Sequence, residues 1–405
     1  MESITIEGVG GLSKQINNAA MQAVCDFLGG YKPGFELVEG ASSDAVEQFI
    51  VIRKRGLPGL LLPTSQNALR VALSGFIGVK PWTGLISSLA QIAVKFGLFS
   101  SRVSVLSLKS QTGEVPPFRQ FLTSVLERDD YHLALRTSFG RPNAKIVIQA
   151  VSHDGSALCF VKVGSEKMSD KLVAHESEVL VKLEHSDLPI LTPRTLYQGV
   201  WEQRWQVLIT EPMLTHPLDD DATEAQLASD SFTTAGEMTT CALRDSEYWL
   251  WISGRINRLE DMGLPVEAFN TALARIDAVW GSTELDFGAS HGDWSRANVG
   301  IIDGQVAAYD WERYSHCSPR GTDIAHFSLF EFDDRHRGFD VERVAEKTRQ
   351  NLKAADRPEE HAQLLVILGC LEMSLRFMSA QKAGVQAKDK IFGQALEDGL
   401  RKWAT

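Results

Sequence analysis

Apolar and polar positions follow two different patterns along the chain. Short apolar runs bounded by Gly, Asp and Ser are typical of strands. Apolar residues that recur every three or four positions are typical of the buried face of a helix. The runs that predict strands are residues 35–38, 48–52, 60–62, 102–108, 131–137, 145–151, 157–163 and 205–210.

Helical spacing predicts a second set of elements, several of which fall between the strands. A mixed α+β fold is therefore expected. The predicted helices are residues 14–27, 66–76, 85–99, 118–126, 170–184, 223–245, 247–262, 266–280, 363–377 and 390–403, with a further one from residue 324.

The clearest local signal is a hairpin between residues 299–302 and 305–309, two apolar runs separated by an Asp-Gly pair. Asp-Gly between two such runs is a strong signal for a two-residue turn. Pairing outward from the turn places Asn298 opposite the residue that precedes Asp310. Facing residues on paired strands lie about 4.5–5.5 Å apart, so an amide oxygen and a carboxylate meet at the open end of the hairpin.

Asp293 lies on the loop just before this hairpin, within the sequence SHGDWSRANVG. Its carboxylate, the amide of Asn298 and the carboxylate of Asp310 would form a cluster of oxygen ligands. Mg²⁺ prefers such ligands and completes its coordination with water and substrate phosphates. The stretch therefore predicts a magnesium site; the alternative is a hairpin with a capped loop and no chemistry.

A lysine and a glutamate are predicted to lie in apolar surroundings on consecutive elements. Lys162 falls within the run LCFVKV, and the helix predicted over residues 170–184 carries Glu176 in its apolar stripe. A buried ammonium is costly unless it finds an anion, so the two side chains suggest an ion pair. The alternative is that Lys162 extends to the edge of its strand while Glu176 lies at the rim of the helix.

Composition limits the class of protein. The chain has 405 residues, 44% of them hydrophobic, with a formal net charge of -11 and a pI of about 5.5. Such a balance argues against nucleic-acid binding and is compatible with a soluble protein or with a cationic substrate. The five cysteines are scattered and form no C-x-x-C motif, which predicts neither a disulfide framework nor a zinc site. With no signal peptide and no apolar stretch long enough to span a bilayer, we expect a cytoplasmic protein without a transmembrane segment.

The stretch from HGD through the hairpin to DWE resembles the catalytic segment of the aminoglycoside phosphotransferase and choline kinase group of small-molecule kinases. Those enzymes resemble protein kinases, whose corresponding motifs are H-R-D-x4-N and D-F-G. The resemblance implies a bilobal protein-kinase-like fold, with a small β-rich lobe and a large helical lobe, that binds ATP and Mg²⁺. It also implies that Asp293 is the catalytic base and that Asn298 and Asp310 hold the metal.

The same resemblance implies residues that bind the nucleotide. Lys162 would reach the α- and β-phosphates of ATP and pair with Glu176. Phe160, on the same strand face as Lys162, either packs on the adenine or belongs to the core. Weaker candidates are Gly140, in the loop between two predicted strands, and Glu211 and Met213, at the expected hinge between the lobes.

Three parts are expected along the chain. Residues 1–125 form an N-terminal α/β extension of unknown role, residues 126–212 the nucleotide-binding small lobe, and residues 213–405 the helical catalytic large lobe.

The segment after the hairpin departs from the family pattern. Family members commonly read D-P-x-x-D-L-A there, whereas this chain reads SPRGTDIA, with Ser318 in place of the first Asp. Asp323 is expected to brace the loop or to cap a helix, and His291 to brace the catalytic loop through hydrogen bonds. Three other histidines lack metal-ligand spacing and are expected to be structural or exposed: His316, His326 and His336.

The expected function is ATP- and Mg²⁺-dependent phosphorylation of a hydroxyl on a small molecule. An aminoglycoside, choline, a sugar, an amino alcohol or a nucleoside-like antibiotic would each fit as acceptor. Arg296, three residues after Asp293, either reaches the γ-phosphate or forms a local salt bridge.

Four alternatives compete with this function. A non-catalytic nucleotide-binding or scaffold protein and a nucleotidyl transferase would keep the same residues. A protein kinase is disfavoured by the short path from Asp310 to Asp323. A divalent-metal hydrolase would have no use for the pair of Lys162 and Glu176.

Overall fold

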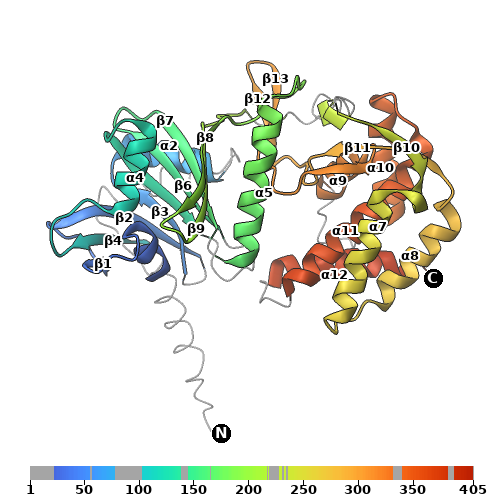
Figure 1. Cartoon of the computed structure of the whole chain (residues 1–405), viewed down its shortest axis with the longest axis horizontal. Helices are drawn as coiled ribbons and strands as arrows, with labels where there is room; N and C mark the ends of the chain where they lie inside the picture. The colour runs from blue at the N-terminus through green and yellow to red at the C-terminus, as the bar shows by residue number, and fades with distance from the viewer. Residues whose placement is uncertain are drawn as a thin grey trace, which may run out of the picture. The chain divides into compact units, whose positions relative to one another are not determined.

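The computed structural model describes residues 22–54, 57–77, 103–137, 145–164, 166–216, 218, 228–229, 232–233, 236–331, 340–381 and 387–404. The chain divides into two compact units. The sheet unit comprises Met1–Phe139, Ala144–Ala174 and Arg194–Pro212; the helical unit comprises Gly140–Asn143, His175–Pro193 and Met213–Thr405. The mixed α+β fold, with a sheet-rich part and a helical part, is the fold class predicted from the sequence (Figure 1).

Nine strands of the sheet unit form one sheet. They are β1 (Phe35–Glu39), β2 (Ala45–Lys54), β3 (Leu57–Pro63), β4 (Val103–Ser110), β5 (Tyr131–Thr137), β6 (Lys145–Ser152), β7 (Ala157–Gly164), β8 (Thr195–Trp201) and β9 (Trp205–Thr210). Their order is β1-β4-β2-β3-β5-β6-β7-β9-β8, and neighbouring strands are antiparallel. Because β3 pairs with β5, the strands of the first 125 residues continue the sheet that carries Lys162.

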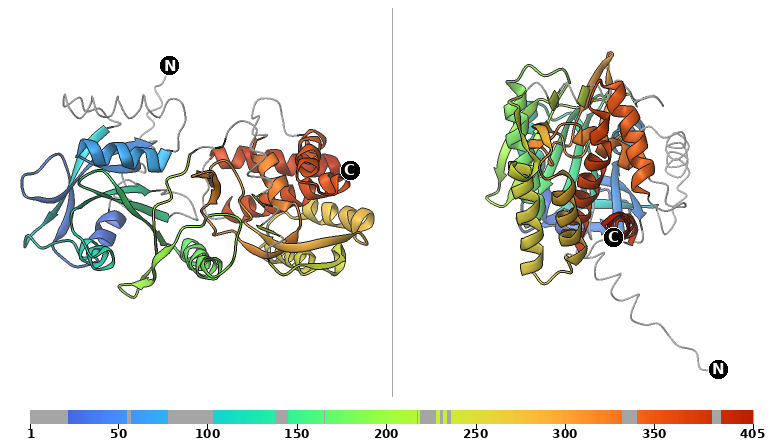
Figure 2. Two further views of the ribbon diagram at one scale, coloured as in Figure 1. Left: turned by 90° about the horizontal axis from the view of Figure 1, so that it is seen from above. Right: turned by 90° about the vertical axis from the view of Figure 1, so that its right-hand side faces the viewer.

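Different helices cover the two faces of this sheet (Figure 2). One face packs against α4 (Pro117–Leu126) and the helix over residues 22–28. The other packs against α2 (Gln66–Ile77), in a smaller apolar cluster that includes Phe160. Side chains alternate between the faces of a strand, so Lys162 lies on the same face as Phe160.

The helical unit contains most of the predicted helices and two small sheets. Its strands are β10 (Thr239–Ala242), β11 (Glu284–Ser290), β12 (Val299–Ile302), β13 (Gln305–Ala308) and β14 (Ser315–Pro319). Strand β11 lies between β10 and β14, and β12 pairs with β13 alone. Its helices are α7 (Glu247–Asp261), α8 (Glu267–Trp280), α9 (Thr322–Glu331), α10 (Val341–Ala354), α11 (Ala362–Gln381) and α12 (Ala387–Ala404), with short 3-10 helices η1 (Leu243–Asp245) and η2 (Glu359–His361); α5 (Lys167–Glu184) contributes residues to both units.

Helix α11 is the most apolar of these helices. A 21-residue stretch, Glu359–Ser379, has a mean hydropathy of 1.4, and 78% of it is buried. By length and composition it could cross a membrane, so the expectation that no stretch is apolar enough is wrong. Within the unit it contacts α9, α10 and α12, which is the environment of a core helix.

Some elements differ from the prediction. Strands β8, β10, β11 and β14 and helix α10 were not predicted, and the helix expected over residues 223–245 is wrong at its end. There, β10 pairs with β11, Thr240 facing Asp286, and η1 follows. The helix predicted over residues 85–99 lies outside the described residues.

Candidate active site

The loop between β11 and β12 carries the HGD motif and is fixed by the ring of His291. The His291 Nδ1 accepts the backbone N–H of Asp293 at 3.2 Å, and its Nε2 lies 3.2 Å from the carbonyl oxygen of Tyr309. A neutral ring with its proton on Nε2 satisfies both contacts. His291 therefore ties the loop to the end of the hairpin, as expected.

Asp323 holds the same loop from the opposite side. Its two carboxylate oxygens accept the backbone N–H groups of His291 at 2.7 Å and of Gly292 at 2.9 Å. Burial raises the pKa of Asp323, while His291 and these two N–H groups act to lower it. Asp323 is the second residue of α9, so of the two expected roles the structure supports the brace.

Replacing Asp323 with Ala is expected to destabilise the helical unit by about 2–5 kcal/mol, because two buried N–H groups lose their acceptor. Asp340 offers a matched control. It also accepts two N–H groups, from Glu342 and Arg343, but at an exposed helix start, where loss of a cap costs about 1 kcal/mol. Urea unfolding of both variants checks the difference; equal losses would contradict the brace.

Position 292 requires glycine because of its backbone conformation and because neighbouring atoms leave no room for a Cβ. Its φ is +75°, and a Cβ there would lie 2.2 Å from the carbonyl oxygen of Arg313. The Gly292 carbonyl accepts a hydrogen bond from Arg376 Nη1 at 2.8 Å. The residue before Asp293 is thus held against two arginines from distant parts of the sequence.

Asp293 and Asn298 are in direct contact. The Asn298 amide nitrogen lies 2.9 Å from Asp293 Oδ2 and 2.9 Å from the Asp293 carbonyl oxygen. Because the amide nitrogen is engaged in this way, Oδ1 is the Asn298 atom that could ligate a metal.

Asp293 is a half-buried carboxyl whose pKa is perturbed by its surroundings. Burial raises its pKa; Arg376 acts to lower it, the negative charge of Asp310 to raise it, and Arg313 to lower it. Asp310 and Asp293 are therefore close enough to interact electrostatically. A carboxyl with a raised pKa is a better proton acceptor near neutral pH, provided that it is ionised.

The hairpin has the predicted register. Ile302 faces Gln305 across the turn, and the Tyr309 N–H donates to the Asn298 carbonyl at 3.0 Å. This pairing brings Asp310 to the open end of the hairpin, as predicted.

An acidic cluster surrounds Asp310. One carboxylate oxygen each of Glu176, Asp310 and Glu312 lie within 4.8 Å of one another, and Glu176 Oε1 accepts the backbone N–H of Trp311 at 3.2 Å. Glu312 was not singled out from the sequence, although it is the last residue of the DWE motif. Carboxylate oxygens gathered in this way are ligands that suit Mg²⁺.

Lys162 and Glu176 belong to different units. Lys162 lies on β7, in register with Val147 on β6 and Leu208 on β9, whereas Glu176 belongs to the helical unit. Their pairing stays a prediction. Phe160 packs edge-on against Phe76 of α2, with ring centroids 6.4 Å apart, which supports the core alternative for this residue.

The weaker candidates have local partners or lie outside the described residues. Glu211 pairs with Arg194, and this hydrogen bond lowers the pKa of Glu211. Arg296 contacts Glu331 at 3.0 and 2.8 Å, so the local salt bridge expected as one alternative is formed. Met213 lies half-buried in a loop, and Gly140 lies outside the described residues.

The other expected histidines show no ligand cluster within the described ranges. His316 is exposed, with its Nε2 3.2 Å from Glu247. His326 is buried on α9, and burial lowers its pKa. His336 lies outside the described residues.

No protein-family model and no curated protein matches this sequence. Among solved structures, a thermostable mutant of aminoglycoside phosphotransferase APH(4)-Ia is similar, with 14% identity, a TM-score of 0.48, and coverage of 70% of this chain and 98% of that one. The Plasmodium vivax ethanolamine kinase Pv091845 is similar with 12% identity, a TM-score of 0.45, and coverage of 66% and 81%. The amicoumacin kinase hAmiN, bound to AMP-PNP, Ca²⁺ and Ami, has 11% identity, a TM-score of 0.42, and coverage of 71% and 93%.

Proposed function

We propose that this protein transfers the γ-phosphoryl group of ATP to a hydroxyl of a small molecule. The observation that carries the proposal is the contact between Asp293 and Asn298, together with the electrostatic effect of Asp310 on Asp293. In this proposal, a proton acceptor and two oxygen ligands meet at the open end of one hairpin. Phosphoryl transfer requires this combination of a base and a place for a metal.

Asp293 is the proposed catalytic base. The acceptor hydroxyl gives its proton to the Asp293 carboxylate as its oxygen bonds to the γ-phosphorus. The bond between the γ-phosphorus and the bridging oxygen breaks, and ADP leaves. The hydrogen bond from Asn298 and the loop contacts of Asp323 hold the carboxylate in place for this step.

Asp310 and Asn298 Oδ1 are the proposed ligands of Mg²⁺, with Glu312 and Glu176 close to Asp310. A bound metal ion would neutralise negative charge on the phosphates of ATP. We expect a cation among these carboxylates because their negative charges repel one another and a cation would reduce the repulsion.

The proposal assigns the non-transferred phosphates to Lys162, with Glu176 as its partner. We also propose that Glu211 and Met213, at the expected hinge between the lobes, contact the adenine of ATP. The salt bridge of Arg296 with Glu331 competes with any contact to the γ-phosphate.

Acceptor-dependent formation of ADP tests the proposal. The protein is incubated with ATP, Mg²⁺ and a panel of hydroxylated metabolites and antibiotics, and ADP is measured with and without each compound. At least one acceptor is expected to raise ADP formation, and chelation of Mg²⁺ to abolish the increase. A protein that binds ATP but shows no acceptor-dependent ADP would instead fit a scaffold.

A further inference from the structure

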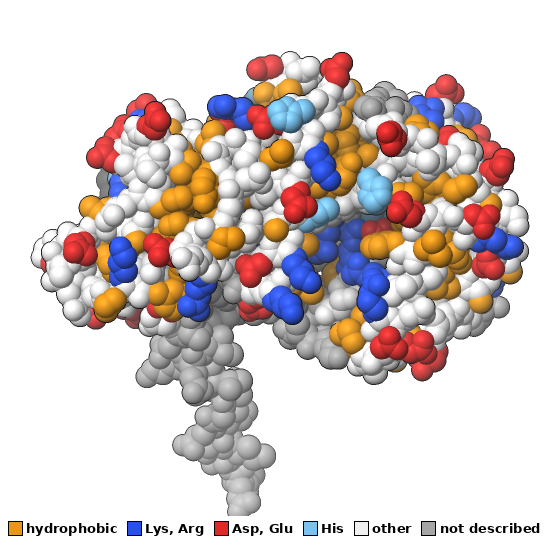
Figure 3. Space-filling model, in the orientation of Figure 1, with side chains coloured by type: hydrophobic (Ala, Val, Ile, Leu, Met, Phe, Trp, Pro, Cys, Tyr) orange, Lys and Arg blue, Asp and Glu red, His pale blue; other side chains and the backbone are white. Residues whose placement is uncertain are grey.

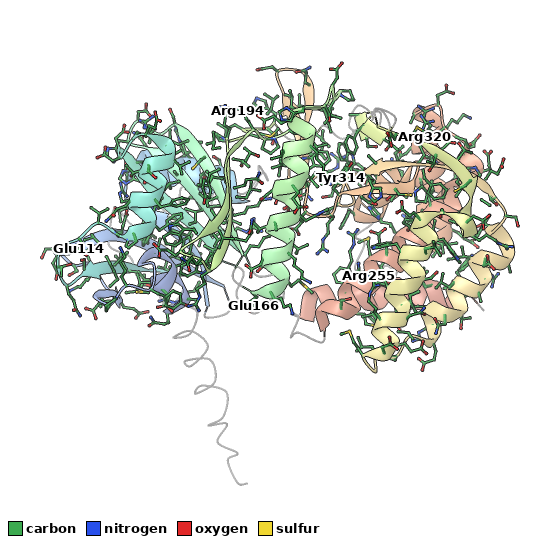
Figure 4. All side chains as sticks on the ribbon, viewed as in Figure 1. Glu114, Glu166, Arg194, Arg255, Tyr314 and Arg320 are labelled. Atoms are coloured by element: carbon green, nitrogen blue, oxygen red, sulfur yellow. The ribbon has the colours of Figure 1, made fainter. Side chains whose placement is uncertain are left out.

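A cavity of about 340 Å³ opens in the helical unit beside the catalytic loop. Its walls come from α7, from α11 and from the segment over residues 312–318 that follows the acidic cluster. Figure 3 shows Lys and Arg side chains on the surface of the helical unit, and Figure 4 shows Arg255 on α7 and Tyr314 on the segment that leads into β14. The residues that give it its character are Tyr248, Trp251, Arg255, Arg313 and Arg376.

Two of the three arginines have partners that fix them. Arg376 pairs with Glu372 and donates to the Gly292 carbonyl, and Arg313 lies 3.8 Å from Glu312.

Arg255 is different. Its guanidinium lies over the ring of Trp251, 5.6 Å from the centroid, and no carboxylate of the described residues pairs with it. It is half-buried, so its fork of N–H donors is presented to the cavity with its hydrogen-bonding capacity largely unused.

The arginines also repel one another. Burial lowers the pKa of Arg255 to about 10, and the positive charges of Arg376 and Arg313 contribute to this. Burial likewise lowers the pKa of Arg313, with Arg376 as the next cause. Three glutamates also line the cavity, and each lies beside another cationic or titratable partner: Glu372 beside Arg376, Glu247 beside His316 and Glu312 beside Arg313. The charge of Glu372 acts to raise the pKa of Arg255, against the effect of the other two arginines. An anion in the cavity would relieve the repulsion.

The same arginines connect the cavity to Asp293. The Arg313 carbonyl is packed against Gly292, and both Arg313 and Arg376 act to lower the pKa of Asp293. Two residues that line the cavity beside Arg255, Arg313 and Arg376, therefore also contact the residue that precedes the proposed base.

We propose that this cavity binds the acceptor, and that the acceptor carries an anionic group, a carboxylate or a phosphate, held by Arg255 with help from Arg313. This inference rests on the proposed function. A guanidinium matches both anions because it donates two parallel hydrogen bonds to their oxygens. A cationic group placed beside Arg255 would instead be repelled by its guanidinium.

Calorimetric titration of the full-length protein tests the inference with defined probes. Glycerate and glycerol 3-phosphate carry a hydroxyl and an anionic group, glycerol is the neutral counterpart, and ethanolamine is the cationic one. At least one anionic probe is expected to bind more tightly than glycerol and ethanolamine. Arg255→Gln is expected to weaken that binding about 10- to 100-fold, the effect of losing a charged hydrogen-bonding partner. Arg255→Lys keeps the charge but loses the two parallel N–H donors, so its affinity for the anionic probe should lie between those of the wild type and Arg255→Gln.

Arg258 provides the matched control, because it is an exposed arginine one turn further along α7. Arg258→Gln is expected to leave binding of the anionic probes unchanged. Binding of neither anion, a preference for glycerol or ethanolamine, or equal effects of Arg255→Gln and Arg258→Gln would each overturn the inference.

Binding needs no turnover, so the titration separates this inference from the proposed function. Arg255-dependent binding of anions without any phosphoryl transfer would support the site and contradict the kinase. Transfer of the phosphoryl group to neutral or cationic acceptors only would support the kinase and contradict the anion-binding acceptor site.

Discussion

Replacing Asp293 with Asn is expected to lower kcat by about 10²- to 10⁴-fold, the usual contribution of a positioned proton acceptor. The amide keeps the shape of the side chain, and one oxygen remains to accept the hydrogen bond from Asn298. It cannot take the proton of the acceptor hydroxyl. Affinity for ATP, measured by equilibrium binding, should change little. A variant with normal kcat would remove Asp293 from the chemistry.

The pH dependence of wild-type activity provides an independent test of the role of Asp293. Burial raises the pKa of Asp293, and only the ionised form acts as a base. Activity should therefore rise with pH through an apparent pKa above that of an ordinary aspartate. If activity instead rose with pH through the pKa of an ordinary aspartate, the environment described for Asp293 would be contradicted.

Replacing Asp310 with Asn is expected to lower kcat/KM at least about 100-fold and to raise the concentration of Mg²⁺ needed for half-maximal activity, because the charged ligand is lost. Asn tolerates the positive φ of +72° at this position. Removing the charge also removes one cause of the raised pKa of Asp293, so the acid limb of the residual activity should move to lower pH.

Asp303 supplies the control for this variant. It lies at the exposed tip of the same hairpin, also with a positive φ, and contacts neither Asp293 nor the acidic cluster. Asp303→Asn should retain full activity and the normal Mg²⁺ requirement. If the two variants behaved alike, Asp310 would have no special role in metal binding.

The hairpin could be predicted because all of its determinants are local. An Asp-Gly turn between two apolar runs fixes the pairing, and the register then places Asn298 beside Tyr309. The same reasoning did not find β10, whose pairing partner β11 lies more than forty residues later. Residues of β10 such as Thr240 carry no alternating pattern long enough to reveal a strand.

Glu176 illustrates a prediction that was right about burial and incomplete about partners. Its place in an apolar stripe predicted a buried acid, and only 1% of the residue is exposed. Its contacts with Trp311 and the acidic cluster depend on a loop more than a hundred residues later. A sequence pattern within one helix holds no information about such a contact.

The arginine cavity could not be predicted for the same reason. Arg255, Arg313 and Arg376 come from three separate segments, and none belongs to a motif. The overall charge of -11 was compatible with a cationic substrate, whereas Arg255 presents a positive charge to this cavity. Net charge describes the average surface, and the residues around a site decide its local potential.

Transfer of the γ-phosphoryl group in a single turnover tests the central claim most directly. Excess protein is mixed with Mg²⁺, an acceptor and ATP labelled at the γ-phosphate, and the labelled small molecule is followed with time for the wild type and Asp293→Asn. The label is expected to move from ATP to the acceptor in the wild type and at least about 100-fold more slowly in the variant. Equal rates in the two proteins, or label found only in inorganic phosphate, would contradict a kinase in which Asp293 is the base.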